Sequence, residues 1–235
     1  MGQKKLLRFA AIKNFSNVFE YPTNVAGQWN SNFKNTHPII LELACGRGEY
    51  TVGLAELNKE KNFIGVDIKG NRMYVGAKKA LSEGLFNAFF LRTQIEMIAD
   101  YFSPREIDEI WITFPDPQLR TSRAKKRLTH PRFLRLYQKV LKKEGVIHLK
   151  TDSPALYQFT LKVIEMYGLN LIESCDDVYS QEKVSPELKI KTFYESLDIS
   201  GSNKIFYLKF SLPEQIKNLD EELQLLLKET EPSSL

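Results

Sequence analysis

The chain has 235 residues, 43% of them hydrophobic and 26% charged, and its formal net charge is +4. This length suffices for one domain with a sizeable core, and the composition excludes a disordered or fibrous chain. No window approaches the roughly 20 apolar residues of a transmembrane helix, and no signal peptide follows the basic N-terminus, so we expect a cytoplasmic protein without a membrane partner.

The charge is distributed unevenly along the chain. Residues 213–235 hold six acids and two bases, so the rest of the chain is markedly basic, which favours a polyanionic partner. We divide the chain into an N-terminal arm (1–37), a main α/β domain (38–212) and this acidic tail (213–235). An apolar face over 216–227 predicts a docking helix in the tail.

Apolar runs that alternate with helical patterns indicate the fold. Strands are expected, in chain order, at 39–44, 63–67, 88–91, 107–114, 146–149, 169–174 and 205–210. Helices are expected at 50–57, 71–81, 95–102, 133–141 and 155–167. This order predicts a mostly parallel sheet covered on both faces, with ligands beyond the carboxyl ends of the strands. The last two strands have no helix between them and are expected to form an antiparallel pair.

A glycine-containing turn after the first strand is the candidate cofactor site. Gly46 and Gly48 would let a ligand approach the backbone closely, but the pattern is neither G-x-G-x-x-G nor a phosphate loop. The preceding acid, Glu42, would repel a pyrophosphate and attract a sulfonium or ammonium. Asp67 ends the second strand, where a carboxylate accepts hydrogen bonds from ribose hydroxyls. Together the two acids favour S-adenosylmethionine as the cofactor. The glycine-containing turn alone would be equally consistent with a strand–helix connection that binds no ligand.

Asp116, between two prolines at the end of the fourth strand, is the candidate catalytic residue. The prolines would hold its carboxylate at the ligand-binding edge, although a stiff turn is the simpler explanation. Residues 117–143 then contain ten Lys and Arg and no acid. Solvated helix faces usually mix both signs of charge, so we favour phosphate binding by this run.

Two further segments place polar groups near the same edge. Asp152 follows the fifth strand, where it could instead cap the next helix. Thr192-Phe193-Tyr194-Glu195 lies in the long connection 176–203, and long connections are often functional. An ordinary loop with one exposed acid is the alternative.

No metal site or nucleophile–base pair is indicated. Cys45 and Cys175 are far apart and are expected to be free thiols. We expect His148 to be a core strand residue, and His37 and His130 to lie on the surface.

With these motifs in this order, residues 39–210 resemble the bacterial tRNA (guanine-N7-)-methyltransferase family. The most specific part is Phe-Pro-Asp-Pro followed by the basic stretch that ends in Lys126-Arg127-Leu128. The resemblance implies a class I S-adenosylmethionine-dependent methyltransferase: a Rossmann-like α/β fold whose mostly parallel, seven-stranded sheet has helices on both faces. It also implies methylation of a guanine in the variable loop of tRNA, with tRNA as partner and the chain a monomer or homodimer.

The resemblance assigns roles residue by residue. Cofactor contacts are expected from Glu42, Gly46, Gly48, Asp67, Gln94 and Asp116, the last also being catalytic. Substrate contacts are expected from Arg120, Asp152, Thr192 and Glu195. The acid-free run itself, apart from the resemblance, predicts that Arg123, Lys125, Lys126 and Arg127 contact RNA phosphates. The arm would add phosphate contacts from Lys4, Lys5, Arg8 and Lys13.

The chain departs from the family pattern at four places. Ala44 replaces the usual first glycine, Gln94 an acidic residue facing the adenine, Gln118-Leu119 a Trp-Pro, and Arg120 a lysine. Three alternatives remain open. They are a class I methyltransferase with another substrate, a non-catalytic RNA-binding module on the same scaffold, and a nicotinamide dehydrogenase, which the missing third glycine and Glu42 disfavour.

Overall fold

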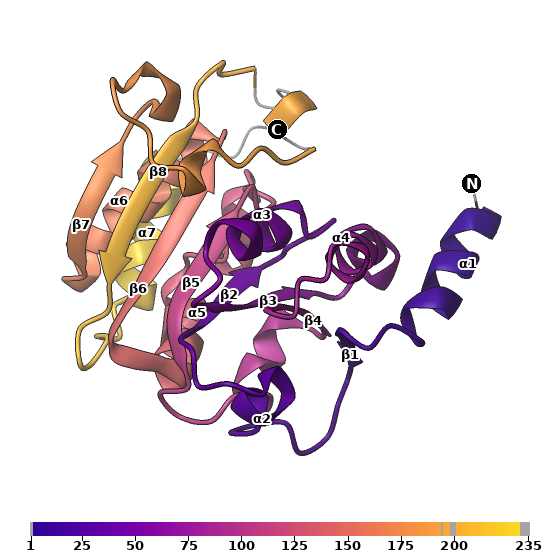
Figure 1. Ribbon diagram of the computed structural model, residues 1–235. Coiled ribbons are helices and arrows are strands. Elements are labelled where there is room, and N and C mark those ends of the chain that lie inside the picture. Colours follow the sequence, from indigo (N-terminus) through magenta and orange to yellow (C-terminus); the bar gives the residue numbers. More distant parts are fainter. Residues whose placement is uncertain (1, 194, 198–200, 231–235) are drawn as a thin grey trace.

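The computed structural model describes residues 2–193, 195–197 and 201–230, and it contains one eight-stranded sheet (Figure 1). The strands are β1 (Val18–Glu20), β2 (Ile39–Leu43), β3 (Asn62–Asp67), β4 (Ala88–Arg92), β5 (Ile107–Thr113), β6 (Leu141–Thr151), β7 (Asn170–Cys175) and β8 (Phe206–Ser211). The α-helices are α1 (Gly2–Ile12), α2 (Trp29–Phe33), α3 (Glu49–Leu57), α4 (Gly70–Ser82), α5 (Pro131–Val140), α6 (Pro154–Tyr167) and α7 (Asp220–Thr230). The 3-10 helices are η1 (Ile95–Asp100), η2 (Thr121–Lys126), η3 (Val178–Ser180), η4 (Glu187–Lys189) and η5 (Glu195–Leu197).

The sheet is parallel over most of its width and antiparallel at one end. Its order is β1-β4-β3-β2-β5-β6-β8-β7, in which β8 pairs antiparallel with both β6 and β7. All pairs from β1 to β6 are parallel. The predicted α/β sheet with a final antiparallel pair is therefore confirmed.

The number of strands predicted for the sheet, seven, is wrong. The eighth strand, β1, comes from the segment expected to be an arm, and it extends the sheet by pairing with β4. The same segment buries Ile12 and Trp29 completely, and the Trp29 indole N–H donates to the Tyr101 carbonyl at 2.8 Å. Three consecutive residues without alternating polarity give no readable strand pattern, which explains the miss.

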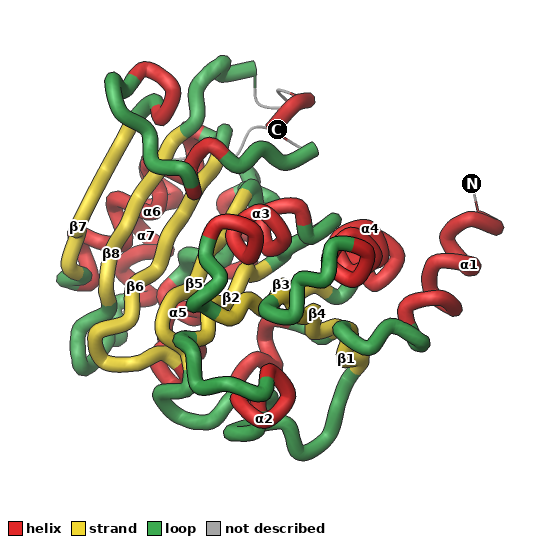
Figure 2. The backbone as a smooth tube through the Cα atoms, viewed as in Figure 1, coloured by secondary structure: helices red, strands yellow, loops and turns green. Residues whose placement is uncertain are grey.

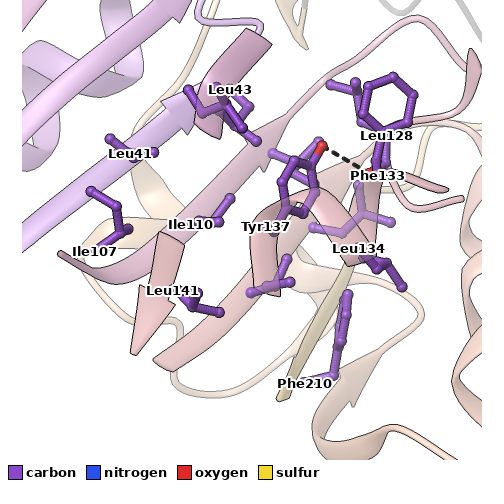
Figure 3. Packing of buried hydrophobic residues seen from close by; sticks show 14 of the residues in the cluster. Leu41, Leu43, Ile107, Ile110, Leu128, Phe133, Leu134, Tyr137, Leu141 and Phe210 are labelled. Atoms are coloured by element: carbon purple, nitrogen blue, oxygen red, sulfur yellow. Dashed lines mark hydrogen bonds between the residues drawn. The ribbon is translucent and has the colours of Figure 1, made fainter. Parts of the chain in front are cut away.

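Two hydrophobic cores cover the two faces of the sheet. Helices α3 and α4 lie on one face, and α5, α6 and α7 on the other (Figures 1 and 2). In the larger core, Phe133, Leu134 and Tyr137 of α5 pack against β5 and β6 (Figure 3). The Tyr137 hydroxyl donates to the Leu128 carbonyl at 3.1 Å, which fixes the turn before α5 to the helix.

Local side-chain chemistry sets several helix boundaries. The Arg132 amide donates to His130 Nδ1 at 3.1 Å, so His130 caps α5. The prediction that His130 lies on the surface is wrong, because the residue is only 3% exposed. His148 is buried in β6 as predicted. Residues 95–100 form a 3-10 helix where an α-helix was expected.

The acidic tail contains the expected docking helix, α7. Its Leu223 and Leu227 are buried against the main core. Residues 231–235 lie outside the described part of the chain. Within that part, no helix is long and apolar enough to cross a bilayer.

Candidate active site

A cavity of about 1130 Å³ opens at the carboxyl ends of the central strands. Its wall includes the residues that directly follow each strand: Ala44 after β2, Ile68 after β3, Thr93 after β4, Phe114 after β5 and Asp152 after β6. The cavity therefore lies at the edge of the sheet where ligand binding was predicted.

The turn after β2 runs through three left-handed residues. Ala44, Gly46 and Gly48 have φ values of 58°, 56° and 72°. A Cβ at Gly48 would lie 2.4 Å from Phe90 Cε1, so only glycine fits there. Ala44 adopts the same backbone region with a side chain, at a cost of roughly 1–2 kcal/mol. Ala44 and Gly46 line the cavity wall here, whereas Gly48, also predicted as a cofactor contact, does not.

Glu42 lies beneath this turn and joins three elements. Its carboxylate accepts hydrogen bonds from the Thr51 amide at 2.7 Å, from the Thr51 hydroxyl and from the Thr113 hydroxyl at 2.6 Å. It is only 3% exposed, and burial raises its pKa to about 7 despite these hydrogen bonds. The residue at the predicted cofactor position is thus an acid that titrates near neutrality.

Asp67 and its neighbours form the next part of the wall. The Asp67 carboxylate accepts from the Gly46 amide at 2.9 Å and the Lys69 amide at 2.7 Å, which fixes its orientation. Gln94 is exposed on the wall. Beside it, the Thr93 hydroxyl is buried and has no hydrogen-bond partner among the described residues. Thr93 was missed from the sequence; its place directly after a strand of this edge was the available signal.

Asp116 is exposed on the opposite part of the cavity wall. The chain reaches it through Phe114, whose φ is 46°, and its Oδ1 accepts from the Gln118 amide at 3.0 Å. The Phe114 amide donates to the Lys150 carbonyl at 2.8 Å, so β5 stays attached to β6 up to the turn. A rigid backbone therefore presents this carboxylate to the cavity.

Asp152 and Thr192, which are predicted to contact substrate, both lie on the cavity wall. Asp152 is not a helix cap, because the Ser153 hydroxyl caps α6 by accepting from the Leu156 amide at 3.3 Å. The connection that carries Thr192 is tied to the start of α3, where the Phe193 amide donates to Glu49 at 2.8 Å. Tyr194 lies outside the described residues.

Glu195, expected to contact substrate, is not on the cavity wall. Its side chain is 5% exposed and pairs with Lys150 at 3.0 Å, while the Tyr179 hydroxyl donates to its other oxygen. Lys150 is fully buried and also donates to the Ile190 carbonyl at 2.9 Å. Burial lowers the pKa of Lys150, and the Glu195 carboxylate opposes that shift. We therefore assign Glu195 to holding the loop that carries Thr192.

The start of the basic run remains a candidate phosphate surface. Arg120, Arg123, Lys125 and Lys126 are exposed in and before η2, and none forms an ion pair with a described residue. Lys126 also reaches the cavity wall, whereas Arg120, the expected substrate contact, does not.

Arg127 does not belong to this surface, contrary to the prediction. It is 1% exposed, and its guanidinium lies 4.5 Å from the Phe159 ring centroid. It donates to the carbonyls of Gln118 at 3.2 Å and Leu119 at 3.4 Å. Arg127 therefore anchors the turn after Asp116 to α6, and we withdraw it as a phosphate contact.

Four of the five later bases of the run, all except Lys139, have acidic partners among the described residues of other parts of the chain. The pairs are Arg132–Glu96, Arg135–Asp220, Lys142–Asp108 and Lys143–Glu214. Two of these acids, Asp220 and Glu214, belong to the acidic tail, so the tail pairs with Arg135 of α5 and Lys143 of β6.

Comparison with known proteins decides the family. Residues 36–208 match a family model described as putative methyltransferase. The tRNA (guanine-N(7)-)-methyltransferase of Porphyromonas gingivalis is 49% identical over 215 residues, covering 86% of this chain and 87% of its own. The enzyme of that name from Christiangramia forsetii is 48% identical over 223 residues, covering 90% and 100%. The chain belongs to the tRNA (guanine-N7-)-methyltransferase family.

Solved structures agree on the fold. The 16S rRNA methyltransferase KamB has a TM-score of 0.57 at 14% identity, covering 78% of this chain and 94% of its own. The class I methyltransferase fold expected from the sequence is thus confirmed, and family membership disfavours the dehydrogenase and the non-catalytic module.

Proposed function

We propose that this chain transfers a methyl group from S-adenosylmethionine to N7 of a guanine in the variable loop of tRNA. The observation that carries the proposal is family membership at 48–49% identity over most of the chain. The site supports it, because Glu42, Gly46 and Asp67 line one part of the cavity while Asp116 and Lys126 line another.

The residues at the β2–β4 side of the cavity fit the cofactor. When bound, S-adenosylmethionine supplies an electrophilic methyl group on a sulfonium centre. The carboxylates of Glu42 and Asp67 suit its positive charge and its ribose hydroxyls. The buried Thr93 hydroxyl and the exposed Gln94 amide offer hydrogen bonds for the remaining polar groups. An unpaired buried hydroxyl is costly, so a ligand that pairs it gains affinity.

On the opposite side, Asp116 would act on the guanine. N7 already carries an in-plane lone pair, so no base is needed to activate it. Methylation makes the purine ring cationic, and a fixed carboxylate stabilises the charge that develops. Asp152 and Thr192 border the same space and would hold the base in place. Alignment of this kind can contribute roughly 7–11 kcal/mol of barrier reduction.

The guanine must leave its stack in the tRNA to reach this cavity, at a cost of a few kcal/mol. Contacts of Arg123, Lys125 and Lys126 with phosphates would offset that cost. Because Lys126 also lies on the cavity wall, the phosphate surface and the site of chemistry are continuous.

The test is transfer of labelled methyl to unmodified tRNA, followed by nucleoside analysis for 7-methylguanosine. Asp116→Asn should lower kcat on the order of 10²–10³-fold while tRNA affinity stays within about twofold. Asp100→Asn, at an exposed aspartate outside the cavity wall, is the matched control and should keep full activity. A methylated nucleoside other than 7-methylguanosine would contradict the proposal, and an Asp116→Asn enzyme of normal rate would remove Asp116 from the mechanism.

A further inference from the structure

A second basic surface lies away from η2, where α1 packs beside α4 (Figure 1). Neither residues 1–19 nor residues 68–82 contain an acid. Two segments far apart in sequence therefore place only positive charge side by side. We define the α1–α4 surface as Lys5, Arg8, Lys13, Lys69, Arg72 and Lys78.

Tyr74 of α4 is the centre of this surface. The Arg8 guanidinium lies 5.5 Å and the Lys78 ammonium 6.0 Å from the centroid of its ring. Phe15 stacks on the same ring at 5.4 Å, which fixes the chain after α1 to α4. Neither Arg8 nor Lys78 forms an ion pair with a described residue. Folding thus brings two cations to one ring and leaves their charge without a carboxylate, an arrangement that a bound anion stabilises.

The α1–α4 surface leads into the cavity. Lys69, just before α4, and Arg72, in the first turn of α4, contribute to the cavity wall. Lys78 lies two to three helical turns further along α4, which at 1.5 Å per residue is roughly 13 Å from Lys69. In the chain, α4 follows β3 and η2 follows β5, and β2 lies between β3 and β5 in the sheet. Positive charge therefore borders the cavity on both sides.

We propose that the α1–α4 surface binds the sugar-phosphate backbone of the tRNA at a second place, across the cavity from η2. The inference rests on the proposed function, and it adds α4 and the cavity rim to the contacts expected from the N-terminal segment. A polyanion longer than the cavity can contact both surfaces at once, whereas a small anionic substrate cannot. Two separated contacts would also hold the RNA on both sides of the base that enters the cavity.

The test compares two triple variants in tRNA-binding titrations from 50 to 300 mM salt. The first is Lys5→Gln/Arg8→Gln/Lys78→Gln. The matched control, Lys34→Gln/Lys59→Gln/Arg105→Gln, removes the same charge from exposed bases that precede strands, at the opposite edge of the sheet. The first variant should lose on the order of tenfold in tRNA affinity at low salt, and the slope of log K against log salt should fall by about 2–3. The control should lose less than about threefold.

Further readouts separate this proposal from the proposed function. Thermal stabilisation by S-adenosylhomocysteine should match the wild type in both variants, since neither changes a cavity-wall residue. Equal affinity and salt slope in the first variant and the control would overturn the α1–α4 proposal while wild-type methylation of tRNA still stood. If the wild type makes no 7-methylguanosine, the proposed function fails instead, whatever the titrations show.

Discussion

The buried pair between Lys150 and Glu195 allows a sharp test of how the active-site loop is held. We consider Lys150→Met, which keeps the length of the side chain and removes the charge. The Nζ of Lys150 contacts Glu195 at 3.0 Å and the Ile190 carbonyl at 2.9 Å, and the Tyr50 and Phe114 ring centroids each lie 5.4 Å away. The substitution leaves the Glu195 carboxylate buried with no cation beside it.

The magnitude follows from the burial of both partners. The Lys150 side chain is 0% and the Glu195 side chain 5% exposed, so water cannot replace the lost partner. Removing one member of such a pair destabilises a protein by about 3–5 kcal/mol. For a chain of this length, each kcal/mol lowers Tm by about 2–4 °C, so we expect a fall on the order of 10 °C. The double variant Lys150→Met/Glu195→Gln has no uncompensated charge and should recover to within about 2 kcal/mol of the wild type.

Urea unfolding of the wild type, both single variants and the double variant gives the coupling energy by a double-mutant cycle. Lys191→Met is the matched control. Lys191 is exposed on the same loop, 5.5 Å from the Tyr179 ring centroid, and should change stability by less than about 0.5 kcal/mol. If Lys150→Met is as stable as Lys191→Met, the pair does not hold the loop, and the role assigned to Glu195 is wrong.

Three other experiments test the remaining site assignments. Because burial raises the pKa of Glu42 from 4.5 to about 7, the stabilisation that its protonated form provides is present at low pH and is lost as pH rises through 7. The difference in unfolding free energy between wild type and Glu42→Gln should therefore fall by about 3 kcal/mol between pH 4.5 and 8, and a flat difference would contradict the burial argument. Arg127→Leu should destabilise the fold by about 2–4 kcal/mol because it leaves two loop carbonyls without their donor, whereas Arg123→Leu should be neutral in stability and weaken tRNA binding; equal unfolding midpoints would refute the distinction. Ala44→Gly should stabilise the chain by about 1 kcal/mol by relieving its left-handed backbone, and thermal unfolding that shows a loss would mean that the methyl group packs usefully.

The features that were predicted correctly depend on short stretches of sequence. Alternating apolar runs predicted the parallel sheet, and the glycines after Glu42 predicted the turn that opens onto the cavity. The two prolines around Asp116 predicted a fixed carboxylate at the same edge. Each of these signals operates within a few residues, through turn chemistry, side-chain periodicity or restricted backbone angles. The order of the strands then places their ends together.

The features that were missed depend on contacts between distant segments. Lys126 and Arg127 are adjacent bases, yet one is exposed at the cavity rim and the other is buried against Phe159 of α6. Glu195 reads as an exposed loop acid until Lys150, 45 residues away, is placed beside it. Local pattern identifies which residue types are present and roughly where strands end, because backbone preferences are local. Whether a charged side chain stabilises the fold or remains available to a substrate depends on its burial and its ion-pair partner. Only the packed structure determines that burial and that partner.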